Sequence, residues 1–260
     1  MFTADTRSRL LASLVERARS DGRISAAALV GSLAGGTADA FSDIDLSFGL
    51  VADARLEEVV EDWTRHMVEH EGAVVLFDLE ARGTQYRVFL RDDCLQIDLS
   101  FTPGGEVRKA SPRFVQLFGR FHEAAVATPE YAQMCGWAVH LAHAARVRIE
   151  RGRVQQAHWC VSELHEQLVS VYCAARDLAW AYGRGADELP EQLRANLDRG
   201  IAAATDPSEL DRALGACIDL LVAYDGPGRE VIVAVRPQFE QFRHRLAPPD
   251  ECGPPLGQSK

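Results

Sequence analysis

The sequence predicts an α+β fold, in which a mixed sheet with flanking helices is followed by an all-α helical bundle. Short segments that alternate apolar and polar residues are confined to the chain before about residue 101. Segments with helical periodicity dominate from about residue 111 onward. We therefore expect a first domain at 1–124, a helical domain at 125–246 and a disordered tail at 247–260, where Pro, Gly and polar residues replace the periodic pattern.

Helices and strands are expected to alternate through the first domain. Leu10, Leu11, Leu14 and Val15 have helical spacing and predict a helix at about 4–20, which Asp21-Gly22 ends. The remaining predicted elements are a strand at 26–30, a short helix after Gly31-Ser32, a strand at 43–50, a helix at 53–71, a strand at 73–79, and a hairpin of strands 84–91 and 94–101 around Asp92-Asp93.

The second half reads as helical from Ser111-Pro112, a suitable N-cap and first helical residue. Thr128-Pro129 opens a long helix that Gly152 ends after about residue 151. Further helices are predicted at 154–182, 188–204, 207–224 and 228–245, which together would form a bundle.

Composition and charge exclude several classes of protein. The 260 residues carry a formal net charge of −10, which disfavours a nucleic-acid binder because such proteins need clustered Lys and Arg. The six cysteines show no C-x-x-C spacing, so we expect reduced thiols. Charges interrupt the apolar pattern of the first 20 residues, and the chain has no run of 18 apolar residues. We therefore expect a cytoplasmic protein with no membrane partner.

Three aspartates are expected to lie on the polar faces of two strands. Asp43 and Asp45 alternate with the apolar residues of the strand at 43–50, so both leave the same face of the sheet. Asp98 alternates in the same way within 94–101. If the two strands are neighbours, the three carboxylates converge, and their repulsion calls for a cation such as Mg²⁺. The Gly31-Ser32 turn adds backbone N–H groups that a phosphate can approach without meeting a Cβ atom.

These residues resemble the signature of a known family. Gly31-Ser32, a spacer of ten residues, Asp43-Ile44-Asp45 and Asp98 on a later strand resemble the nucleotidyltransferase superfamily that includes DNA polymerase β and the aminoglycoside nucleotidyltransferases. The resemblance implies metal binding by Asp43, Asp45 and Asp98, and nucleotide phosphate binding by Gly31 and Ser32. Gly35 departs from the pattern, because many members have an arginine there that can contact phosphate or the acidic cluster.

The resemblance implies an enzyme of the small-molecule branch. It would use two Mg²⁺ ions to transfer AMP from ATP, or a nucleoside monophosphate from another NTP, to a hydroxyl of a small molecule. The family suggests an antibiotic such as an aminoglycoside or lincosamide, with the helical domain at 125–246 closing over the nucleotide and holding the acceptor. The alternative is an antitoxin-like protein of the same fold that binds or nucleotidylates a protein partner. The long helical half favours the first hypothesis.

One stripe in the second half is a candidate acceptor site. Trp159, Glu163, Glu166 and Ser170 recur at intervals of three or four residues in a predicted helix, so two carboxylates lie beside an aromatic ring. Such a stripe could recognise an ammonium-bearing acceptor. A solvated helix face with one half-buried Trp is the alternative, and it is the commoner reason for this pattern.

Overall fold

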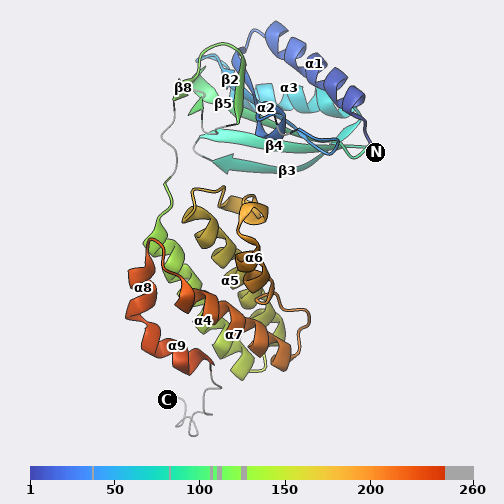
Figure 1. Cartoon of the computed structure of the whole chain (residues 1–260). Helices are drawn as coiled ribbons and strands as arrows, with labels where there is room; N and C mark the ends of the chain where they lie inside the picture. The colour runs from blue at the N-terminus through green and yellow to red at the C-terminus, as the bar shows by residue number, and fades with distance from the viewer. Residues whose placement is uncertain (37, 82, 106–107, 110–112, 124–127, 244–260) are drawn as a thin grey trace, which may run out of the picture. The chain divides into compact units, whose positions relative to one another are not determined.

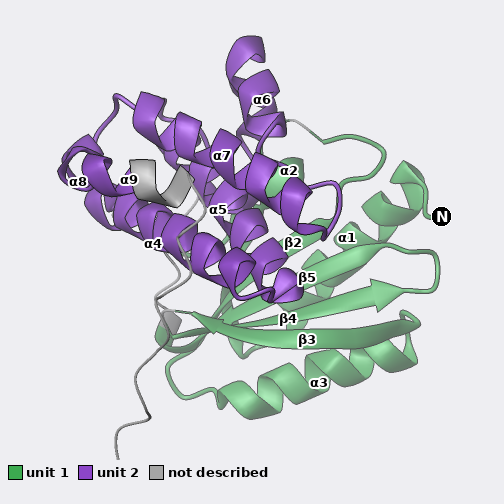
Figure 2. Ribbon diagram, turned by 90° about the horizontal axis from the view of Figure 1, so that it is seen from below, with its two compact units in different colours: residues 1–127 green, residues 128–260 purple. Residues whose placement is uncertain are grey.

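The computed structural model describes residues 1–243 except 37, 82, 106–107, 110–112 and 124–127. The chain divides into two compact units, Met1–Ala127 and Thr128–Lys260 (Figure 2), each of which is described by itself below. The predicted domain change near residue 124 and the predicted tail at 247–260 lie outside the described residues. None of the described helices is long and apolar enough to cross a membrane.

Unit 1 is built on a six-stranded mixed sheet with the strand order β3-β4-β5-β2-β1-β7. The strands β2 and β5 pair in parallel, and the other neighbouring strands pair antiparallel. The bounds are β1 Ile24–Val30, β2 Ile44–Leu50, β3 Ala73–Ala81, β4 Thr84–Arg91, β5 Gln96–Thr102 and β7 Phe114–Phe118. The predicted mixed sheet and the predicted hairpin of β4 and β5 are therefore confirmed.

Two helices cover one face of this sheet. α1 spans Ala4–Ser20 and α3 spans Leu56–Glu69, and both lie on the same side of the sheet (Figure 1). Their apolar stripes pack on the buried side chains of β2 and β5. Trp63 of α3 is fully buried, and its ring lies 4.7 Å from that of Phe48 and 6.1 Å from that of Phe101. Because strand side chains alternate, the residues between these apolar positions point to the other face of the sheet.

The strand β7 corrects the helical interpretation of the chain after residue 111. Phe114–Phe118 pairs antiparallel with β1, which would otherwise be the edge of the sheet. Two-residue strands, β6 Arg108–Lys109 and β8 His122–Glu123, also pair in this region. Five residues are too few for helical periodicity to be told from strand alternation, and the unpaired hydrogen-bonding groups of β1 decide the conformation. Ser111 and Pro112 lie outside the described residues.

Unit 2 is helical, as predicted, with a core between three long helices. α4 Tyr131–Glu150, α5 Val154–Ala174 and α7 Pro207–Ala223 contribute most of the buried residues. Inside this core the fully buried Arg146 pairs with Glu150 at 3.3 Å and with Asp211 at 2.6 Å. The shorter elements are η2 Ala181–Gly183, η3 Ala186–Glu188, α6 Glu191–Asp198, α8 Arg229–Ala234 and α9 Arg236–Arg243.

Three predicted helix lengths in this unit were wrong. α5 ends at Ala174 instead of 182, because Asp177 adopts a left-handed conformation with φ 57° and the N–H of Leu178 donates to the carbonyl of Cys173. This is the hydrogen-bond pattern that commonly closes helices. The helix predicted at 188–204 is the shorter α6, and the one predicted at 228–245 is divided into α8 and α9.

Candidate functional site

The Gly31-Ser32 turn joins β1 to the site. Gly31 starts the short helix α2, Gly31–Ala34, and has a left-handed φ of 72°. A Cβ atom at Gly31 would overlap the Oδ2 atom of Asp45. Only glycine satisfies both conditions, because it tolerates positive φ and leaves space for the carboxylate. The backbone of the turn therefore lies directly against Asp45.

Asp45 and Asp98 are aligned by the parallel pairing of β2 and β5. The two residues are direct partners in the register, so both side chains leave the same face of the sheet on strands about 4.8 Å apart. Two residues further along each strand, and so on the same face, Ser47 and Ser100 are also partners, and their hydroxyl oxygens lie 3.0 Å apart. The amide of Gln96 donates to Oδ1 of Asp98 at 3.0 Å and orients that carboxylate.

Asp43 is positioned by a cross-linked loop that immediately precedes it. The buried guanidinium of Arg7, on α1, donates to the carbonyl oxygens of Asp39 at 2.7 Å and of Ser42 at 2.8 Å. The Ser42 hydroxyl donates to Oδ1 of Asp39 at 3.0 Å and accepts from the Asp39 backbone N–H at 3.0 Å. Phe41 also donates its backbone N–H to Oδ1 of Asp39, so several hydrogen bonds hold the loop that leads to Asp43, the residue directly before β2.

The surroundings of Asp43 and Asp98 disfavour the ionised form of both carboxylates. Burial raises the pKa of Asp43, the charge of Asp98 raises it further, and Arg7 offsets part of this effect. Burial also raises the pKa of Asp98, which the hydrogen bond from Gln96 partly offsets. The register therefore makes Asp45 and Asp98 neighbours, and Asp43, which directly precedes β2, lies within reach of the charge of Asp98.

The three carboxylates have suitable chemistry for a hard divalent cation. Among the described residues, no group of three or more His, Cys, Asp or Glu side chains is arranged to hold a metal ion by itself. Mg²⁺ does not need such a cage, because it usually binds one or two carboxylates and completes its shell with water and substrate phosphates. Closely spaced carboxylates with raised pKa values fit that requirement, since a cation between them would relieve their repulsion.

Sequence reasoning missed two arginines beside the site. Arg7 lies inside the predicted first helix, and nothing in the local pattern distinguishes it from its exposed neighbours. Arg113 immediately precedes β7, which was predicted to be helical. The run of Phe114, Val115 and Phe118 is typical of a strand, and it is the signal that could have placed Arg113 next to the Gly31-Ser32 turn.

The predicted acceptor residues belong to unit 2. Trp159, Glu163 and Glu166 all lie on α5, and their spacing puts them on one side of that helix. Trp159 is 55% exposed, Glu166 is exposed and Glu163 is half-buried. The stripe therefore faces outward from the helical core, and its role in acceptor binding stays a prediction.

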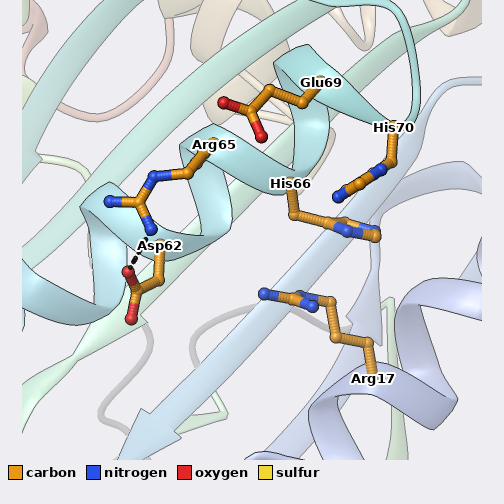
Figure 3. Close-up of a pocket in the computed structure, with 6 residues that line it drawn as sticks. All are labelled: Arg17, Asp62, Arg65, His66, Glu69 and His70. Carbon is orange, nitrogen blue, oxygen red and sulfur yellow. Dashed lines mark hydrogen bonds and ion pairs between the residues drawn. The ribbon is translucent and has the colours of Figure 1, made fainter.

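A separate hollow of about 300 Å³ lies on the helical side of unit 1 (Figure 3). Its walls come from α1 and α3, which cover the face of the sheet opposite the carboxylates, so we do not assign the chemistry to it. The guanidinium of Arg17 lies 5.1 Å from the Trp63 ring, and the rings of His66 and His70 are 5.2 Å apart. The lining residues are Arg17, Asp62, Arg65, His66, Glu69 and His70.

No family model and no curated protein matches the sequence. Similar solved structures include an aminoglycoside 6-adenyltransferase from Bacillus subtilis, with 15% identity over 90% of this chain and 96% of that chain and a TM-score of 0.38. They also include a nucleotidyltransferase-like protein from Exiguobacterium sibiricum 255-15, with 11% identity, coverages of 91% and 77%, and a TM-score of 0.39. Because both TM-scores lie below 0.5, we base the function on this chain's own residues.

Replacing Gly31 tests how closely the turn packs against Asp45. G36A is a matched control, because Gly36 also has a positive φ, of 68°, but a Cβ atom there would meet nothing within 4 Å. We expect G36A to cost about 1 kcal/mol of unfolding free energy from backbone strain, and G31A to cost a further ~1–3 kcal/mol because Asp45 must move. Urea unfolding of both variants measures the difference, and equal costs would contradict the contact.

The half-buried His66 should make stability depend on pH. Burial lowers the pKa of His66 below 6.5, and the positive charge of Arg17 lowers it further. A group with a lowered folded-state pKa stabilises the protein above its unfolded pKa, and that stability is lost as the pH falls below about 6.5. We expect the parent to lose more thermal stability between pH 7.5 and 5.5 than H66Q does. H122Q, at an exposed position of β8, is the control and should follow the parent.

Proposed function

We propose that this protein is a metal-dependent nucleotidyltransferase that transfers AMP from ATP to a hydroxyl group of a small molecule. The observation that carries the proposal is the register of Asp45 with Asp98, combined with the close approach of the Gly31 backbone to Asp45. A phosphate-accessible turn and paired carboxylates are the two parts that phosphoryl-group transfer through a metal-bound nucleotide requires.

Each residue has a defined role in the proposed reaction. Asp43 and Asp45 hold the metal-nucleotide, and the backbone N–H groups of Gly31 and Ser32 donate to its phosphates. Asp98 lies beside the acceptor and takes the proton of its hydroxyl as the oxygen bonds to the α-phosphorus. The bond between the α-phosphorus and the bridging oxygen breaks, and pyrophosphate leaves. Mg²⁺, when bound, neutralises charge on the transferred and leaving phosphate groups.

The acceptor is proposed to be a hydroxylated small molecule that also carries ammonium groups. Glu163 and Glu166 supply two carboxylates on the same side of α5 as the exposed ring of Trp159. Carboxylates pair with ammonium groups, and an aromatic face attracts cations at close range. An aminoglycoside or a lincosamide has this chemistry, and these antibiotics are the acceptor classes to be tried first.

Nucleotide binding should depend on a divalent metal. The acidic face can hold a triphosphate only when a cation lies between the two negatively charged groups. We expect calorimetric binding of ATP in the presence of Mg²⁺ and its loss after addition of EDTA. Binding of the same strength with and without EDTA would contradict the proposed site.

The proposed roles of Asp45 and Asp98 predict that the D45N and D98N variants behave differently. D45N should lose both ATP binding and turnover, whereas D98N should retain most ATP affinity and slow the chemical step by roughly 10²–10⁴-fold, the usual range for general-base assistance. D92N, in the exposed hairpin turn, is a control that should behave like the parent. Pyrophosphate release across a panel of hydroxylated amines measures turnover, and intact-protein mass would reveal transfer to protein instead. Turnover of D98N close to the parental rate would exclude the role given to Asp98.

The D98N variant also tests whether the buried charge of Asp98 destabilises the fold. Because the pKa of Asp98 is raised by burial, its ionised form destabilises the fold near neutral pH, and Asn removes that charge. We expect D98N to melt no lower than the parent in the presence of EDTA. A clearly lower melting temperature would show that Asp98 stabilises the metal-free fold.

A further inference from the structure

The strand register places Arg113 beside the Gly31-Ser32 turn. Phe114 is the partner of Val30 in the antiparallel pairing of β7 with β1. In an antiparallel pair, the residue before Phe114 lies opposite the residue after Val30, which is Gly31. Arg113 therefore reaches the site from a strand that runs beside β1, and its side chain starts next to the backbone that is proposed to hold phosphate.

Gly35 leaves the space that the Arg113 side chain occupies. A Cβ atom at Gly35 would lie 2.8 Å from Cδ, 2.9 Å from Cγ and 3.3 Å from Nε of Arg113. The aliphatic stem thus crosses the Cα atom of Gly35, four residues after Gly31. Any side chain at position 35 would have to displace this stem, because 2.8 Å is shorter than real Cβ contacts.

The two arginines near the site have different surroundings. Arg7 is buried, and its guanidinium donates to two carbonyl oxygens of the loop before Asp43, so it has a structural role. Arg113 is exposed and lies on the side of the turn.

We infer that Arg113 binds a phosphate group of the nucleotide donor at the Gly31-Ser32 turn, and that Gly35 is needed to let its side chain cross the turn. The inference rests on the proposed function. A planar guanidinium with several N–H donors suits phosphate oxygens, and a cation on this side complements the carboxylates that hold the metal on the other. The negative charge of the triphosphate would then be shared between the metal and Arg113.

Nucleotide affinity tests the inference directly. We expect R113A to weaken calorimetric binding of Mg²⁺-ATP by about 10–100-fold, the range for a charge-assisted hydrogen bond, and R113K to keep part of that affinity. R120A removes an exposed arginine beyond the other end of β7 and should bind like the parent. The affinity of R113A should also fall less steeply with added salt than that of the parent, which a purely structural role would not cause.

Moving the arginine from position 113 to position 35 supplies a second test. An arginine at position 35 would start where the Arg113 stem now passes, so G35R/R113A should bind Mg²⁺-ATP at least tenfold more tightly than R113A does. Equal ATP affinity of R113A and the parent would overturn the inference while leaving the proposed function intact, and so would a double variant as weak as R113A. A folded parent that binds no nucleotide in Mg²⁺ would overturn the proposed function and the inference with it.

Discussion

Repulsion between carboxylates on one face of the sheet is the constraint on which the arrangement of unit 1 depends. Asp45 and Asp98 are partners in the strand register, burial and the charge of Asp98 raise the pKa of Asp43, and burial raises the pKa of Asp98. A protein selected for stability alone would place neutral residues there. The destabilisation by these charges is offset by the large apolar core on the opposite face, where Trp63 and its aromatic neighbours are fully buried.

The site is rigid because each part is held by a different element. Parallel pairing fixes Asp45 to Asp98, the buried Arg7 fixes the loop before Asp43, and the absence of a side chain at Gly31 fixes the turn against Asp45. These supports come from two strands, one helix and one turn. Preorganised groups of this kind need little rearrangement when a charged substrate arrives, which is the usual source of catalytic advantage at phosphate-transfer sites.

Local sequence patterns predicted the parts of the site that lie in regular strands. Alternation placed Asp45 and Asp98 on polar faces, and the structure confirms that they are neighbours. The same patterns could not predict β7, because its five residues are held by the edge of β1 rather than by their own periodicity. They also could not distinguish Arg7 from any exposed helical arginine, since its partners are carbonyl groups of a loop more than thirty residues away.

The parallel alignment of β2 with β5 has a consequence for how this chain can vary. β3 and β4 lie between these two strands in the sequence but at one edge of the sheet in space. The chain from Val51 to Cys94 can therefore lengthen at its surface loops, for example to accommodate an inserted tag, without separating Asp45 from Asp98. Deleting a single residue between Leu95 and Asp98 is different, because side chains alternate and Asp98 would then point toward Phe48 and Trp63. The loops between β2 and β5 can therefore change in length, whereas the number of residues from Leu95 to Asp98 cannot change by one without turning Asp98 to the other face of the sheet.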